Sequence, residues 1–201
     1  MIDKVLRIPK QQLLRPAAGR LERISPITIT LFALVAGLSS VWFAAAGSHL
    51  WALVMWLANR LLDGLDGEVA RVHTLQSDWG GYVDILSDML VYAALPLALV
   101  SADPTPLAWL MLALMLAVFY LNAGSWMMLS AILEKRGRGS ERQHERTSVT
   151  MPSGLIEGTE TVVIYCLFFL LPGILPLLFA ITAALVGVTI TQRLVWASRV
   201  L

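Results

Sequence analysis

Long apolar runs, separated by short polar breaks, make up most of this chain. A helix that spans a membrane needs about 20 mostly apolar residues. Six segments approach or reach this length: 27–47, 50–66, 81–101, 106–133, 155–171 and 175–196. The second is short, and we expect its helix to project beyond the bilayer into the polar residues that follow. The pattern predicts an all-α fold, a bundle of six transmembrane helices.

The polar ends of these runs suggest how the chain is organised. Its 201 residues allow one domain, so we expect a single membrane domain with a juxtamembrane segment at 1–24 and the six-helix bundle at 25–201. Residues 2–21 interleave apolar and basic positions, which predicts an amphipathic segment lying at the membrane interface. The alternative is a basic tail without fixed structure, and Pro9 and Pro16 limit any helix there to short pieces.

Composition changes the class of protein that these helices can form. Hydrophobic residues account for 57% of the chain and charged residues for 14%, whereas soluble domains average about 25% charged residues. The chain is therefore expected to be an integral membrane protein. Its single cysteine, Cys166, lies in an apolar run and suits helix packing.

The distribution of charge predicts an orientation. If the N-terminus lies in the cytosol and six helices follow, all 15 lysines and arginines fall on the cytosolic side. The three outer turns then contain one charged residue, Asp103. Basic residues accumulate on the cytosolic side of membrane proteins, so we expect an inner membrane protein with both termini inside the cell.

Candidate chemistry is concentrated between the second and third apolar runs. Helical spacing puts Asp63 and Asp66 on one face, and Asp84 and Asp88 one turn apart on the next helix. A turn at 72–79 would bring the two pairs face to face. The fixed positions of this motif are Asp63, Asp66, Gly67, Ala70, Arg71, Gly80, Asp84 and Asp88.

Four converging carboxylates repel one another unless cations neutralise them. Oxygen ligands select hard ions such as magnesium, manganese or calcium, and two divalent ions would balance four aspartates. A metal pair of this kind suits binding of a pyrophosphate and displacement at phosphorus. A structural network with Arg60 and Arg71 is the alternative, but two arginines cannot neutralise four aspartates and Glu68.

The motif is similar to the signature of the CDP-alcohol phosphatidyltransferases, and every fixed position matches: Asp-x-x-Asp-Gly-x-x-Ala-Arg, eight residues, Gly-x-x-x-Asp-x-x-x-Asp. The resemblance implies a dimeric membrane enzyme that transfers a phosphatidyl group from a CDP-lipid, such as CDP-diacylglycerol, to an alcohol and releases CMP. It implies Mg²⁺ or Mn²⁺ as cofactor and no nucleic-acid partner. One departure lies upstream, where Pro26 and Thr30 fit but Ile27 replaces the asparagine that members often carry.

The resemblance also implies roles for the motif residues. Asp63, Asp66, Asp84 and Asp88 would hold the metal ions, and Asp88 would be the catalytic base that takes the acceptor's proton. The residues expected around the cytidine nucleotide are Asp66, Gly67, Ala70, Arg71 and Gly80.

The acceptor alcohol is not named by the motif. Arginines on the cytosolic side could bind an acceptor phosphate, and glutamates near the fifth helix could bind hydroxyls. This combination favours glycerol-3-phosphate or another phosphorylated polyol, ahead of inositol-phosphate and serine. The alternative is that the arginines only anchor helix ends at the headgroups. The candidates are Arg142, Arg146, Glu157, Glu160 and Arg193, with Asn122, Ser125 and Thr159 nearby.

Two functions of other classes stay open at this point. A divalent-cation transporter would use the same aspartates as a pathway, but it predicts polar residues continuing to the outer face, where Asp103 is the one charge. A catalytically inactive membrane scaffold would tolerate loss of motif aspartates, and none is lost.

Overall fold

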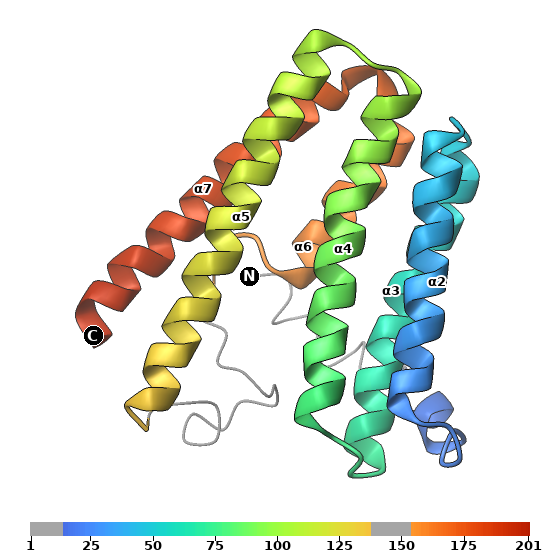
Figure 1. Ribbon diagram of the computed structural model, residues 1–201, viewed down its shortest axis with the longest axis vertical. Helices are drawn as coiled ribbons and strands as arrows, with labels where there is room; N and C mark the ends of the chain where they lie inside the picture. The colour runs from blue at the N-terminus through green and yellow to red at the C-terminus, as the bar shows by residue number, and fades with distance from the viewer. Residues whose placement is uncertain (1–13, 138–153) are drawn as a thin grey trace.

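The computed structural model describes residues 14–137 and 154–201, most of which are helical (Figure 1). In chain order they are α2 (Pro26–Ala45), α3 (His49–Val72), α4 (Asp78–Ala102), α5 (Pro106–Lys135), α6 (Gly158–Leu170), the 3-10 turn η1 (Pro172–Ile174) and α7 (Leu175–Val200). Residues 14–19 are also helical, and no strand occurs within these described ranges. The all-α prediction is confirmed.

Each predicted apolar run coincides with one of the helices α2 to α7. The helix predicted at 50–66 continues to Val72, as expected from the polar residues beyond it. In the described part of the chain, four helical segments are long and apolar enough to cross a membrane: α2, α4, α5, and η1 with α7. α3 carries several charges and α6 has only 13 residues, so the six-span count stays a prediction.

Small residues allow α2 to pack closely against α3 and α4. A Cβ added to Gly37 would lie 2.6 Å from Val91 Cγ2, so the two helices touch through the glycine. Ser40 Oγ donates a hydrogen bond to Ala52 O at 2.6 Å, and Asn59 Nδ2 donates to a carbonyl of α2 at 2.8 Å. Buried polar side chains thus find partners on the neighbouring helix, and the three helices form one unit.

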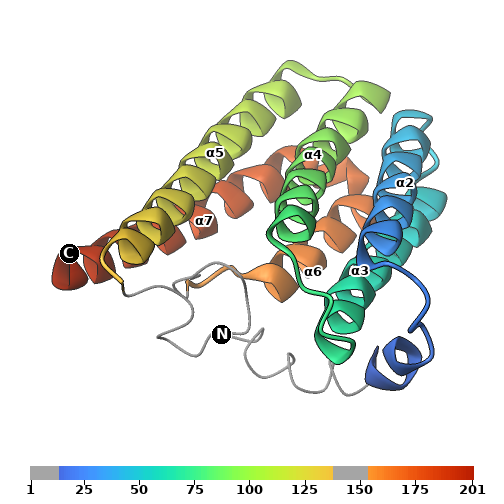
Figure 2. The ribbon, with the colours of Figure 1, turned by 60° about the horizontal axis from the view of Figure 1, so that its bottom comes forward.

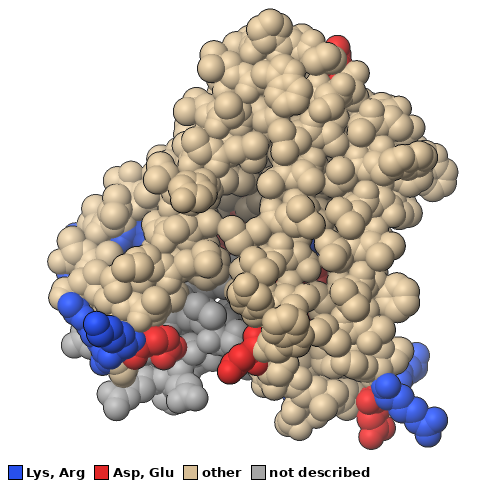
Figure 3. Space-filling model, in the orientation of Figure 1, with Lys and Arg blue, Asp and Glu red and all other residues tan. Residues whose placement is uncertain are grey.

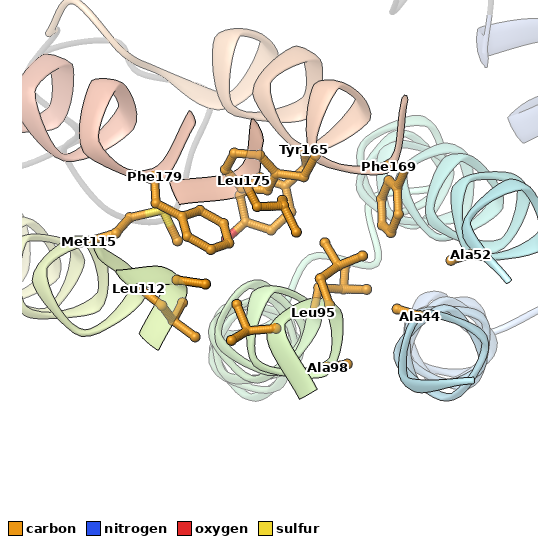
Figure 4. Close-up of a cluster of buried hydrophobic side chains, with 14 of the residues drawn as sticks. Ala44, Ala52, Leu95, Ala98, Leu112, Met115, Tyr165, Phe169, Leu175 and Phe179 are labelled. Atoms are coloured by element: carbon orange, nitrogen blue, oxygen red, sulfur yellow. The ribbon is translucent and has the colours of Figure 1, made fainter. Parts of the chain in front are cut away.

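The helices α5 and α7 lie side by side and form a second unit (Figures 1 and 2). An apolar core joins this unit to α2, α3 and α4. Its side chains come from all six helices α2 to α7 (Figure 4), and many of them lie toward the end at which α4 is connected to α5. Trp56 stacks on Tyr165 with 5.1 Å between ring centroids, and Phe168 meets Phe179 edge-on at 5.0 Å. This packing leaves the opposite end, where α3 turns into α4, for polar residues.

Charge is distributed unevenly along the long axis. On the face seen in Figure 3, lysines and arginines gather at the lower end, while the upper end shows a single small acidic spot. This asymmetry agrees with the pattern that the sequence predicted.

The N-terminal segment is described from residue 14 onward, and residues 1–13 lie outside the described residues. Ala18 is fully buried against Ile29 and Val69. His73 Nε2 lies 3.0 Å from Ala18 O. The helical piece therefore docks on α2 and α3, and an interfacial role for the segment stays a prediction.

Candidate active site

A short turn brings the two halves of the motif together. α3 ends at Val72 and α4 begins at Asp78. Thr74 adopts a positive φ of 54° within the turn, and Ser77 caps α4 by accepting a hydrogen bond from Gly80 N at 3.1 Å. Capping fixes where α4 starts, and its next turns then face the last turns of α3.

The four motif aspartates converge between these helices. Asp63 and Asp84 lie within hydrogen-bonding distance of each other. Asp84 also interacts electrostatically with Asp66 and Asp88, and Asp66 with Asp63 and Asp88. Asp66 is only 5% exposed. Like charges this close need a shared proton or a cation, which makes the cluster a candidate cation site.

Thr30 of α2 holds one of these carboxylates. Its Oγ1 donates a hydrogen bond to Asp66 Oδ2 at 2.6 Å, and both side chains are buried. In the sequence, Thr30 is distinguished only as a position that fits the family pattern. Its contact with the motif comes from the close approach of α2 to α3.

Two arginines form ion pairs with acidic side chains of the motif region, Arg60 with Asp88 and Arg71 with Glu68. Arg60 donates to both oxygens of Asp88, at 2.5 and 3.1 Å, and lies 3.7 Å from Asp63. Arg71 instead pairs with Glu68 at 2.8 Å. From the sequence, Arg60 is expected only in the structural alternative and not as a site residue. The signal was its position one helical turn before Asp63.

The donor set fits a hard divalent cation, because all four converging side chains offer only carboxylate oxygens. As the side chains of the described residues stand, however, no group of three or more Asp, Glu, His or Cys residues is arranged to hold a metal ion. Asp88 faces Arg60 and Asp66 faces Thr30. Binding a cation would therefore require these side chains to rotate.

A cavity of about 420 Å³ lies beside the aspartates, between α2, α3 and α4. Ligand pockets commonly measure about 300–1,000 Å³. Every residue that the resemblance assigned to the nucleotide lines this cavity: Asp66, Gly67, Ala70, Arg71 and Gly80. Ile27 and Thr30 line it too, as do Ser25, Gln76, Ser77 and Trp79, which sequence reasoning missed because nothing in their spacing links them to the motif.

Arg193 lies at a separate place, between α7 and α5. Its Nη1 donates to Asn122 Oδ1 at 2.8 Å and to Ser125 Oγ at 2.6 Å. Its Nε is buried, and in the described residues it has no hydrogen-bond partner. The structure thus brings together three of the residues considered for the acceptor.

The two glutamates considered for the acceptor have a structural role at the start of α6. They form a reciprocal capping box in which Glu157 also accepts from Gly154 N at 3.0 Å. Among the described residues that line the cavity, neither Glu157, Glu160 nor Arg193 occurs. Arg142 and Arg146 lie outside the described residues.

Comparisons with known proteins identify relatives. The family model described as CDP-alcohol phosphatidyltransferase matches residues 23–196. The inner membrane protein YnjF of Escherichia coli K12 is 34% identical to this chain, over 98% of this chain and 95% of that protein. The CDP-diacylglycerol–serine O-phosphatidyltransferase of Mycobacterium leprae is 33% identical over 43% of this chain and 30% of its own length.

Solved structures share the fold. The crystal structure of phosphatidylinositol phosphate synthase from Mycobacterium tuberculosis with CDP-DAG bound has a TM-score of 0.69 at 19% identity, over 92% of this chain and 94% of that chain. The same enzyme in complex with manganese and citrate also has a TM-score of 0.69, at 20% identity, over 92% of this chain and 88% of that chain.

Proposed function

Because the chain belongs to the CDP-alcohol phosphatidyltransferase family, we propose that it transfers a phosphatidyl group from a CDP-lipid to the hydroxyl of an alcohol and releases CMP. One observation carries this proposal. The motif aspartate Asp66 and the other residues assigned to the nucleotide all line one cavity at the polar end of the bundle. The inactive-scaffold alternative has no comparable support.

The donor would bind with its cytidine diphosphate in this cavity. Gly67 and Gly80 leave room for a ligand because they lack a Cβ, and Arg71 offers a guanidinium to a phosphate. The first residues of α4, from Asp78 to Gly81, also line the cavity, and the N-terminus of a helix favours anions. The fold relative from M. tuberculosis was solved with CDP-DAG bound, and CDP-diacylglycerol is the donor that we expect here.

Mg²⁺ or Mn²⁺ would be held by Asp63, Asp66, Asp84 and Asp88, and balance against four carboxylates favours two ions. When bound, the metal supplies charge neutralisation for the pyrophosphate and for displacement at phosphorus. The structure of the M. tuberculosis relative with manganese supports this choice of cofactor. Of the four carboxylates, Thr30 keeps Asp66 in place.

Asp88 would take the proton from the acceptor hydroxyl. A carboxylate beside a cation stays ionised and can accept a proton from a hydroxyl within hydrogen-bonding reach. Asp88 is half-exposed, with 33% of its side chain accessible, whereas Asp66 is buried. It is therefore the better placed of the two to meet an acceptor that enters from the cytosol.

The acceptor is proposed to be glycerol-3-phosphate or another phosphorylated polyol. Arg193 supports this choice because its Nε is buried without a hydrogen-bond partner in the described residues, and Arg142 and Arg146 could add to a phosphate site. Glu157 and Glu160 would meet the hydroxyls. Because these glutamates also cap α6, their substitution would test folding as well as binding.

We further infer that all six helices α2 to α7 cross the bilayer as one domain, with a juxtamembrane segment at 1–24. Both termini and the cavity would face the cytosol. Two copies of the chain would form a homodimer. The family match over residues 23–196 supports a single domain. The gathering of basic side chains at one end supports the orientation (Figure 3).

The test is CMP release by the purified protein in lipid nanodiscs with CDP-diacylglycerol, Mg²⁺ and a panel of acceptors. Glycerol-3-phosphate, inositol-phosphate and serine would be compared at equal concentration. We expect glycerol-3-phosphate to give the fastest release. Release with serine alone would refute the acceptor but not the transferase, whereas no release with any acceptor would refute the transferase proposal.

A further inference from the structure

Among the described residues, Arg60 supplies a positive charge within the aspartate cluster. It lies on α3 one turn before Asp63 and is only 8% exposed. Removing an arginine from water costs several kcal/mol unless its partners compensate. The groups that contact Arg60 must therefore compensate for this cost, and their identity indicates what Arg60 does.

The guanidinium of Arg60 is held on all sides. Nη2 and Nη1 donate to the two oxygens of Asp88 at 2.5 and 3.1 Å, Nε donates to Asn59 Oδ1 at 2.8 Å, and Nη1 donates to Tyr92 Oη at 3.3 Å. Its Cζ lies 4.7 Å from the ring centroid of Trp56 and 5.0 Å from that of Tyr92. A planar group fixed in this way presents a rigid fork to a carboxylate.

This fork occupies carboxylates that a divalent ion would also need. Both oxygens of Asp88 face Arg60, and the Asp63 carboxylate lies 3.7 Å from Nη1. Two cations repel strongly at such distances in a partly buried site. Arg60 and a divalent ion must therefore compete for Asp88.

We propose that Arg60 is a positioning residue of the proposed reaction: its guanidinium fixes the Asp88 carboxylate beside the acceptor hydroxyl and competes with divalent cations for that carboxylate. The charge of Arg60 limits metal affinity, and the bidentate geometry orients the base. The inference rests on the proposed function for its effect on turnover. Its effect on metal affinity follows from the contacts alone.

A purely structural role would look different. Arg60 ties α3 to α4 through Asp88, and Asn59 continues the chain of contacts to Ala33 O on α2 at 2.8 Å. If Arg60 only held the helices together, its loss would weaken folding and leave metal affinity unchanged or lower. A gain in metal affinity together with a loss of turnover separates the two roles.

The test compares Mn²⁺ binding by wild type and by Arg60→Gln. Each purified protein, in detergent and without substrate, is titrated with Mn²⁺, and binding is monitored by electron paramagnetic resonance. Removal of an opposite charge in contact with a carboxylate changes its cation affinity by about tenfold or more. We expect Arg60→Gln to bind Mn²⁺ at least about tenfold more tightly while kcat for CMP release falls about tenfold or more. KM for CDP-diacylglycerol should change by less than about threefold, because Arg60 does not line the cavity among its described residues.

Two further variants complete the design. Arg60→Lys keeps the charge but loses the fork, so it should retain wild-type Mn²⁺ affinity and lose turnover. If Arg60→Gln does not fold, the turnover of Arg60→Lys still tests the proposal. Arg193→Gln is the matched control, because Arg193 is equally buried at 7% exposure but contacts Asn122 and Ser125; without substrate its Mn²⁺ affinity should equal that of wild type.

Unchanged or weaker Mn²⁺ binding in Arg60→Gln, or full turnover in Arg60→Lys, would overturn the proposal. Tighter Mn²⁺ binding in Arg60→Gln, in a protein that releases no CMP with any acceptor, would support the competition and refute the proposed function. Failure of the inference and failure of the function are thus told apart.

Discussion

Thr30→Val removes a single hydroxyl that bonds a buried carboxylate. Thr30 Oγ1 lies 2.6 Å from Asp66 Oδ2, and each side chain is only 5% exposed. Valine has nearly the shape of threonine, so α2 keeps its packing against α3. The change therefore removes only the hydroxyl, which contacts Asp66 and also Pro26 O one turn earlier in α2 at 3.1 Å, and it leaves Asp66 free to turn away from the cavity.

The size of the effect follows from the kind of bond lost. A hydrogen bond to a charged group contributes about 1.5–3 kcal/mol, and about 1.4 kcal/mol corresponds to a tenfold change. We expect Thr30→Val to lower kcat/KM for CDP-diacylglycerol by about 10- to 150-fold and to weaken Mn²⁺ binding.

The assay is CMP release at varied CDP-diacylglycerol, compared with two controls. Thr30→Ser keeps the hydroxyl and should retain most of the activity. Thr182→Val removes a hydroxyl of similar burial, 2% exposed, that donates to Leu178 O at 2.7 Å within α7, and it should change activity by less than about threefold. Wild-type activity in Thr30→Val, or an equal loss in Thr182→Val, would refute the reasoning.

Two other substitutions separate base from acceptor site. Asp88→Asn should lower kcat by about 10²–10⁴-fold while CDP-lipid binding persists, as measured by ligand-induced thermal stabilisation; loss of binding as complete as in Asp66→Asn would exclude Asp88 as the base. Arg193→Ala should raise KM for glycerol-3-phosphate by about tenfold or more with little change for CDP-diacylglycerol, and an unchanged acceptor KM would remove Arg193 from the acceptor site.

The sequence predicted the helices well because hydrophobicity alone places them. Each apolar run became one helix, and the extension of α3 to Val72 followed from its polar C-terminal residues. Convergence of Asp63 with Asp84 followed from helical spacing and a short turn. Both inferences need only local geometry.

Contacts across long sequence separations were not predictable in the same way. Thr30 reaches Asp66 over 36 positions, and Arg60 reaches Asp88 over 28. These pairings depend on how closely α2, α3 and α4 approach one another, which spacing along one helix does not encode.

The capping role of Glu157 and Glu160 at the start of α6 was not predicted from the sequence, for a different reason. The sequence predicted a helix starting at residue 155 and suggested Glu157 and Glu160 as acceptor ligands, which stays a prediction. The helix instead starts at Gly158, with Glu157 as its cap. A pair of acids three residues apart before an apolar run is typical of a capping box, although glutamate is an uncommon cap.

The most direct test of the central claim is metal-dependent CMP release from CDP-diacylglycerol by wild type, Asp66→Asn and Asp103→Asn side by side. Asp66 lines the cavity, whereas Asp103 is an exposed aspartate that follows α4 at its other end. We expect release by wild type and Asp103→Asn with Mg²⁺ or Mn²⁺, none by Asp66→Asn, and none by any of them in excess EDTA. Full release in EDTA, or by Asp66→Asn, would contradict a metal-dependent reaction at the aspartate cluster.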